Sequence, residues 1–212
     1  MSADLVRLVR HGEVFNPAGV LYGRMPEFHL SDRGRDMARL AARSLAGHDI
    51  RRVIASPLTR TRESAQPWLD LFHPAAGLEI DERIIEPTNV FEGTNIRRAV
   101  RANPLLARHF RNPWRPSWGE PFAAIAARMM AAIHDAHASV DGGEVVLVSH
   151  QSPIWMAART VQGRPLATDP RNRRCALSSI TSLALRDGRF VEVSYEEPAA
   201  ELLAGAVDQG AV

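Results

Sequence analysis

A short apolar run that ends in charged residues constrains the fold of this chain most. Leu5 to Val9 is short and rich in branched side chains, and it leads directly into Arg10-His11-Gly12, which predicts a buried strand over residues 4–9. The open ends of strands in an α/β sheet are where ligands bind. We therefore expect Arg10 and His11 at a ligand site, with Gly12 turning the backbone sharply toward the ligand. A solvated turn is the alternative for these three residues taken alone.

Strand-like and helix-like segments alternate along the rest of the chain. Further strands are expected at 52–55, 78–80, 84–85 and 144–148, and helices at 31–46, 57–72, 122–140 and 153–161. Residues 179–185 and 190–195, joined by Asp187-Gly188, predict a terminal hairpin. This alternation predicts an α/β fold, a three-layer sandwich with a mostly parallel central sheet and helices on both faces.

The length of 212 residues fits a single domain over residues 1–212, with three segments that stand apart from its core. Residues 12–30 form a loop rich in Gly and Pro, too long for a simple connection and expected to bind or cover something. Residues 87–121 lack strong periodicity and carry several arginines, which indicates an inserted cap with one short helix. Residues 197–212 are acidic and rich in Ala and Gly, so we expect a loose tail.

Composition places the chain among ordinary globular proteins, with 45% hydrophobic and 24% charged residues. No apolar run is long enough to cross a membrane and residues 1–4 show no signal-peptide pattern, so a cytoplasmic location is expected. A net charge of +2, without interleaved aromatic and basic residues, argues against nucleic acid. The run Arg171 to Arg174 is interpreted as a solvated loop. Cys175 is the one cysteine, which excludes an intramolecular disulfide. A homodimer is one option for the assembly.

Chemically active side chains follow the other predicted strands as well. Strand 52–55 leads into Ser56-Pro57 and on to Arg60, the 84–85 run leads to Glu86, and strand 144–148 ends in Ser149-His150. In a parallel sheet these ends converge at one edge. Considered alone, Arg60 would be interpreted as a solvated helix residue, and His150 would be interpreted as a hydrogen-bonded core histidine. Their shared position at strand ends favours instead a cationic pocket with a single proton donor.

These motifs together resemble the histidine phosphatase superfamily, also called the phosphoglycerate mutase-like family. The resemblance rests on Val9-Arg10-His11-Gly12-Glu13, Leu30-Ser31-Asp32-Arg33-Gly34, Ser56-Pro57-Leu58-Thr59-Arg60-Thr61 and Val148-Ser149-His150-Gln151. It implies that His11 is a nucleophile that forms a phosphohistidine, and that His150 donates a hydrogen bond to the phosphoryl group. The neighbouring Arg10 and Arg60 would keep His11 neutral and bind phosphoryl oxygens, so neither a metal nor a cofactor is implied.

The resemblance also implies a carboxyl that protonates the leaving alcohol and then activates water. Glu86 is favoured because it follows Ile84-Ile85 and precedes Pro87, but the segment to Gly93 departs from the family's glycine pattern. Glu82 and Glu92 are therefore rivals. The residues expected to bind substrate are Asn16, which lies one residue early in its loop, and Gly23, Arg97 and Gln151.

The sequence predicts a metal-independent phosphatase that acts on a small phosphorylated anionic substrate, a phosphomonoester. The first alternative is a phosphoglycerate mutase, which would use the same catalytic residues. It would return the phosphoryl group to substrate because its pocket excludes water. The chain is shorter than typical cofactor-dependent mutases of this resemblance, which favours hydrolysis. A phosphate-binding module without catalysis is the other alternative. His134 and His137 have a spacing that can bind metal, but with no third ligand in view they are interpreted as an exposed helix face.

Overall fold

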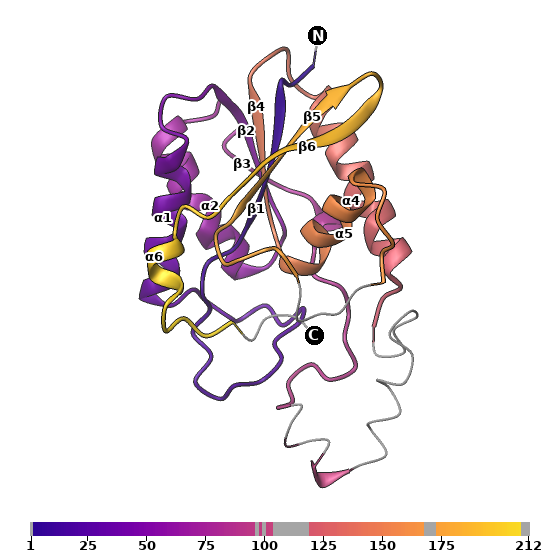
Figure 1. Cartoon of the computed structure of the whole chain (residues 1–212). Helices are drawn as coiled ribbons and strands as arrows, with labels where there is room; N and C mark the ends of the chain where they lie inside the picture. The colour runs from indigo at the N-terminus through magenta and orange to yellow at the C-terminus, as the bar shows by residue number, and fades with distance from the viewer. Residues whose placement is uncertain (1, 96–97, 99–100, 104–118, 168–172, 209–212) are drawn as a thin grey trace.

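One mixed sheet of six strands, in the order β3-β2-β4-β1-β5-β6, forms the middle layer of the computed structural model (Figure 1). The structure describes residues 2–95, 98, 101–103, 119–167 and 173–208. The strands are β1 (Leu5–Arg10), β2 (Ile50–Ala55), β3 (Leu78–Ile80), β4 (Glu144–Ser149), β5 (Ile180–Arg186) and β6 (Arg189–Glu196). The neighbours β1, β4, β2 and β3 run parallel, whereas β5 pairs antiparallel with β1 and with β6. The expected mostly parallel sheet and terminal hairpin are confirmed.

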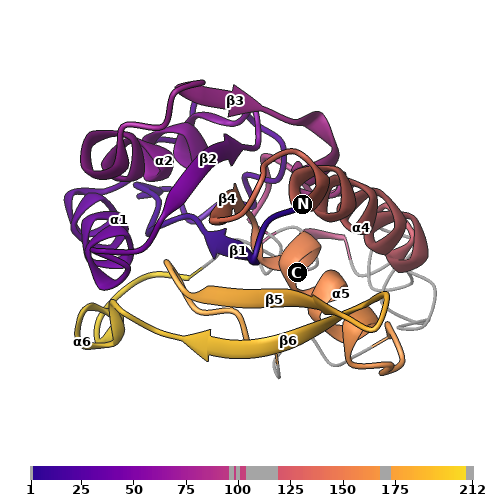
Figure 2. The same cartoon turned by 90° about the horizontal axis from the view of Figure 1, so that it is seen from above.

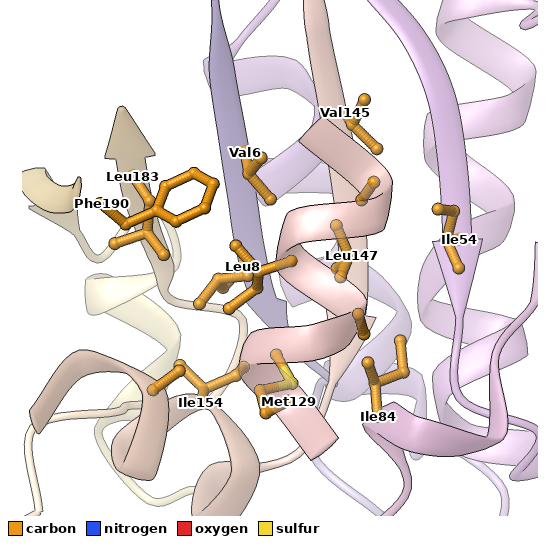
Figure 3. Packing of buried hydrophobic residues seen from close by; sticks show 14 of the residues in the cluster. Val6, Leu8, Ile54, Ile84, Met129, Val145, Leu147, Ile154, Leu183 and Phe190 are labelled. Atoms are coloured by element: carbon orange, nitrogen blue, oxygen red, sulfur yellow. The ribbon is translucent and has the colours of Figure 1, made fainter. Parts of the chain in front are cut away.

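Helices cover both faces of this sheet (Figure 2). On one face lie α1 (Asp32–Ser44) and α2 (Thr59–Phe72), and on the other lie α4 (Phe122–Ala138) and α5 (Gln151–Val161). Apolar side chains of α1 and α2 pack with strand residues such as Val9 and Val146. Those of α4 and α5 pack with Val6, Leu8 and Leu147 (Figure 3). Because β1 is buried on both faces, its sequence is a nearly continuous apolar run.

Two short segments depart from the expected elements. Residues 84–85 are not a strand: a 3-10 turn, η1 (Glu82–Ile84), stands there, and Asp81 caps it by accepting a hydrogen bond from the Arg83 amide at 2.8 Å. At the hairpin, Asp187 and Gly188 adopt φ of 50° and 75°. Positive φ at both central residues is the twist that joins antiparallel strands tightly, so the predicted turn is confirmed.

The tail after β6 is packed rather than loose as far as residue 208. It contains α6 (Ala200–Leu203), and Ala199 is 1% exposed. Leu202, Leu203 and Ala206 pack on a small cluster that includes Met37 of α1. The expectation failed because tertiary contacts, not local composition, order these residues.

The ends of the expected cap segment lie together. Asn89 forms an antiparallel bridge with Gly119, and the Glu120 amide donates to the Thr88 carbonyl at 3.4 Å. Arg97 and most of the segment between these ends lie outside the described residues. Within the described ranges, no helix is both long and apolar enough to cross a membrane.

Candidate active site

The predicted catalytic residues follow the carboxyl ends of the parallel strands or lie in the segments just beyond them. These strand ends point toward the bottom of Figure 1. Each of the residues is 5% exposed or less, although each is polar or charged. Burial of charge is costly unless partners or function compensate, so their clustering requires an explanation. They are Arg10 at the end of β1, His11 after it, Arg60 in the first turn of α2, Glu86 after η1, and His150 capping α5.

His11 is held as one neutral tautomer. Its Nδ1 lies 2.8 Å from the Gly12 carbonyl oxygen, which can only accept, so Nδ1–H is the donor. The pKa of His11 is lowered well below its ordinary value by burial, and then by the nearby Arg60 and Arg10. Nε2 therefore carries a free lone pair at neutral pH.

His150 lies edge-on to His11, with ring centroids 5.2 Å apart. Its Nε2 is 2.8 Å from Ser56 Oγ, and its Nδ1 is 3.8 Å from Oε2 of Glu86. Burial, then Arg60, lowers the pKa of His150 well below the ordinary value, so this imidazole is neutral too. The ring thus lies beside both the Glu86 carboxyl and the His11 imidazole, and within the described residues His150 Nδ1 and Glu86 Oε2 are buried without a hydrogen-bond partner.

Glu86 is the carboxyl group that lies next to His150. Burial raises its pKa to about 7, against the opposing effect of Arg60 and other cations. Its backbone carbonyl accepts from Arg24 Nε at 2.6 Å, which fixes the segment after η1. Of its rivals, Glu82 is exposed, and Glu92 Oε1 accepts from the Arg24 amide at 3.0 Å. The geometry therefore brings Glu86, not the rivals, against His150.

The two predicted arginines present donors to the same region. Arg60 Nη2 donates to the Gly23 carbonyl at 2.6 Å, and its guanidinium lies 4.7 Å from the centre of the Tyr22 ring. Arg10 Nη1 donates to the Cys175 carbonyl at 2.7 Å. Within the described part of the chain, the buried Nε of both arginines has no hydrogen-bond partner. Two buried cations with unused donors can bind an anion.

Glycine is required at position 12 for packing rather than for a sharp turn. Gly12 does not adopt a positive φ, and a Cβ there would lie 2.2 Å from the Gly34 carbonyl oxygen of α1. Its amide donates to Ser64 Oγ of α2 at 3.1 Å. The expected turn toward a ligand is wrong, and the glycine lets the His11 loop press against α1. Ser31 caps α1 as predicted, accepting from the Gly34 amide at 2.9 Å.

The predicted substrate-binding residues are mostly occupied by local contacts. The Asn16 amide donates to the Val20 carbonyl at 2.7 Å and so closes its own loop. Gly23 supplies the carbonyl that holds Arg60. Gln151 Oε1 accepts from Arg173 at 3.3 Å, beside His150 at the start of α5. Arg97 lies outside the described residues.

Arg173 is a site residue that the sequence interpretation missed. Instead of standing in solvent, it donates from Nη1 to Gln151 Oε1 at 3.3 Å, beside His150, and its charge and that of Glu86 each shift the pKa of the other. Its Nε is buried without a partner among the described residues. The only sequence signal was its place in a dense arginine run, which does not separate it from the exposed Arg174.

The histidine pair on α4 packs against an aromatic ring. His134 and His137 lie edge-on to Phe190, with centroids 4.9 and 5.3 Å away. His137 is 8% exposed, so the interpretation as an exposed face is wrong for this residue. In the described ranges no group of three or more His, Cys, Asp or Glu could hold a metal ion.

Comparison with known proteins identifies the family. The sequence model of the histidine phosphatase superfamily (branch 1) matches residues 6–198. Uncharacterized protein Rv0525 of Mycobacterium tuberculosis (strain ATCC 25618 / H37Rv) is 48% identical over 197 residues, covering 92% of this chain and 96% of the relative. Probable phosphoglycerate mutase GpmB of Photorhabdus laumondii is 29% identical, covering 82% of this chain and 83% of the relative.

A solved structure agrees in fold. Mycobacterial glucosyl-3-phosphoglycerate phosphatase Rv2419c superposes with a TM-score of 0.72 at 22% identity, covering 90% of this chain and 97% of that chain. The family model spans nearly the whole chain and therefore decides the family, and the solved structure has the same fold. This chain belongs to the histidine phosphatase superfamily, branch 1.

Proposed function

We propose that this protein is a phosphatase that hydrolyses a phosphomonoester through a phosphohistidine on His11, without a metal ion. The observation that carries the proposal is the fixed tautomer of His11, whose Nδ1–H donates to the Gly12 carbonyl at 2.8 Å. Burial beside Arg60 and Arg10 lowers the pKa of the ring, which keeps it neutral. A neutral imidazole with a free Nε2 lone pair is a competent nucleophile.

The arginines supply the charge that a phosphoryl group needs. The unpartnered Nε donors of Arg10 and Arg60 can bind its oxygens in the ground state and in the transition state. His150 adds a third donor: if the Ser56 hydroxyl donates to Nε2 across the 2.8 Å contact, Nδ1–H is left to donate to a phosphoryl oxygen.

Glu86 carries the protons of both half-reactions. In the first, Nε2 attacks phosphorus, the ester P–O bond breaks, and the Glu86 carboxyl gives its proton to the leaving alkoxide. In the second, water attacks phosphorus, the P–N bond breaks, and the Glu86 carboxylate takes the proton of that water. The products are an alcohol and inorganic phosphate. A pKa of about 7 suits a group that must act as acid and then as base.

The named relatives support two outcomes of the same chemistry. The structural relative named as a phosphatase supports transfer to water. The relative named as a probable phosphoglycerate mutase supports the alternative, in which the phosphohistidine returns its phosphoryl group to a substrate hydroxyl. Whether water reaches the phosphohistidine decides between the two.

The first experiment is hydrolysis of p-nitrophenyl phosphate and of a panel of phosphoglycerates and sugar phosphates in the presence of EDTA. We expect turnover by the wild type, no detectable turnover by His11→Ala, and an unchanged rate for His134→Ala, the matched change of an exposed histidine. Intact-mass spectrometry of Glu86→Gln after brief mixing with p-nitrophenyl phosphate should detect an added phosphoryl group, because its phenolate leaves without a proton whereas the later hydrolysis step lacks its base.

Other outcomes identify the alternatives. Interconversion of 2- and 3-phosphoglycerate without release of inorganic phosphate would replace the phosphatase by the mutase. Binding of phosphate without turnover of any member of the panel would leave the non-catalytic module. Retained activity in His11→Ala would move the nucleophile elsewhere.

A further inference from the structure

A carboxylate from the tail lies on the buried guanidinium of Arg10. Asp208 Oδ2 accepts from Nη1 at 2.7 Å and Oδ1 accepts from Nη2 at 2.5 Å. Nη1 also donates to the Cys175 carbonyl at 2.7 Å. The Arg10 side chain is 0% exposed, whereas that of Asp208 is 40% exposed. This ion pair therefore joins the end of the first strand to the segment beyond α6.

The contact leaves one edge of the guanidinium unused. A guanidinium offers five N–H donors, grouped as an end-on fork of Nη1 and Nη2 and a side-on fork of Nε and Nη2. Asp208 takes the end-on fork of Arg10. In the described part of the chain, the buried Nε has no hydrogen-bond partner. The side-on fork matches the spacing of two phosphate oxygens, so the tail carboxylate holds the far edge and leaves the phosphate-binding edge open.

Several contacts fix the tail in this position. The Val207 amide donates to Glu13 Oε1 at 2.8 Å, and the Ser31 hydroxyl donates to Glu13 Oε2 at 2.5 Å. Glu13, two residues after the predicted nucleophile, thereby ties the tail to the start of α1. Apolar contacts of Leu202 and Leu203 complete the attachment. Figure 1 shows the chain after α6 running back below the sheet toward the end of β1.

We propose that Asp208 is a positioning residue for phosphoryl transfer: it sets the orientation of the Arg10 guanidinium so that its side-on fork meets the phosphoryl oxygens. This inference rests on the proposed phosphatase function. A long flexible side chain loses much of its binding energy in becoming ordered, and a bidentate partner on its far edge removes that cost beforehand. The opposite interpretation, a tail carboxylate that competes with substrate for Arg10, predicts the opposite sign for loss of Asp208.

The test compares Asp208→Asn, Asp208→Glu and a matched control, Asp187→Asn, in the exposed hairpin turn. In Asp208→Asn we expect kcat on p-nitrophenyl phosphate to fall about 10- to 100-fold, with a smaller rise in KM, because orientation matters most in the transition state. Asp208→Glu should recover part of the loss. Inhibition by vanadate, which mimics the five-coordinate phosphorus, should weaken by a factor similar to the fall in kcat/KM. Asp187→Asn should match the wild type.

The contrary results are distinct. Faster turnover or tighter vanadate inhibition in Asp208→Asn would identify a competing tail and overturn the positioning role. Kinetics equal to those of Asp187→Asn would overturn it as well. If the wild type hydrolyses nothing, the phosphatase proposal fails, and calorimetric titration with inorganic phosphate still tests the pair. Weaker phosphate binding in Asp208→Asn than in Asp187→Asn would support positioning, and equal binding would refute it.

Discussion

Two arginines on the same strand, Arg7 and Arg10, are both buried, yet their hydrogen bonding is completed in different ways. Arg7 Nε and Nη2 donate to the Glu144 carboxylate at 2.7 and 3.1 Å, and Nη1 donates to Ser182 Oγ at 2.6 Å. Arg10 has the Asp208 carboxylate on one edge and a buried, unpartnered Nε on the other. The residue type, strand and burial are the same. What differs is that the first network is closed and the second is open, and only an open network has donors left for a ligand.

The buried glutamates near these arginines repeat the contrast. Burial would raise the pKa of Glu144, but hydrogen bonds from Arg7 and His48 outweigh it and lower the pKa. Burial raises the pKa of Glu86 to about 7, because the surrounding cations oppose it only in part. One carboxylate stays ionised as part of the structure. The other can hold a proton at neutral pH, as a group that serves as acid and base must.

The largest effect is expected from opening the closed network. Arg7→Met should lower the free energy of unfolding by about 3–5 kcal/mol, because Glu144 stays buried without its guanidinium partner. Urea unfolding measures it. The depressed pKa of Glu144 stabilises the wild type above pH 4.5, and this contribution is lost as pH falls through the folded-state pKa, so the two proteins should converge at low pH. A large loss of kcat in the folded Arg7→Met protein would contradict a purely structural role.

Removing the open network should affect chemistry more than stability. Arg10→Gln is expected to lower kcat/KM by about 10²- to 10³-fold, the usual loss for one preorganised donor to transition-state charge. Its unfolding free energy should change less than that of Arg7→Met, since the half-exposed Asp208 can be hydrated. Steady-state kinetics and urea unfolding check both statements. Arg51→Gln, in an exposed pair, is the control and should alter neither quantity.

The pH dependence should follow Glu86. The leaving alkoxide needs the protonated acid, so kcat/KM for an alkyl phosphate should fall as pH rises through about 7. On the acid side the limit comes from the second ionisation of the phosphate ester near pH ~6, because the pKa of His11 lies well below its ordinary value.

Glu86→Gln should remove the alkaline limb and lower kcat/KM about 10²-fold for an alkyl phosphate. The loss should be smaller for p-nitrophenyl phosphate, whose phenolate leaves without a proton. Glu82→Gln, a change at the exposed rival, is the control. If Glu82→Gln lowers activity as much as Glu86→Gln does, Glu86 is not the specific proton donor that we propose.

The features predicted correctly from sequence depend on near neighbours in the chain. The apolar run of β1, the cap at Ser31 and the turn at Asp187-Gly188 each follow from a few adjacent residues. The clustering of His11 with the residues proposed as its catalytic partners was predictable as well, because parallel strands bring their carboxyl ends to one edge. The strand expected at 84–85 was wrong, since the cap at Asp81 favours a turn that the apolar pattern does not reveal.

The features missed depend on contacts between distant segments. Arg173 and Arg174 are adjacent and chemically identical in sequence, yet one donates to Gln151 beside His150 and the other pairs with Glu192. Asp208 follows a segment whose composition predicts a loose tail, and packing on α1 together with the Val207–Glu13 hydrogen bond brings the carboxylate to Arg10. No local pattern encodes either placement.

The smallest loss of activity is expected on substitution of Ser56. This residue extends the comparison of closed and open hydrogen-bond networks to an uncharged side chain. Its buried hydroxyl lies 2.8 Å from His150 Nε2, and in the proposed mechanism its donation to that nitrogen keeps the proton of the imidazole on Nδ1. A hydrogen bond of this kind contributes about 0.5–1.5 kcal/mol, so Ser56→Ala should lower kcat by up to about tenfold with little change in KM. Ser44→Ala, which removes a hydroxyl bonded within α1, is the matched control. If the two variants have equal kcat, the tautomer of His150 does not depend on Ser56, and the distinction between closed and open networks applies to the charged groups alone.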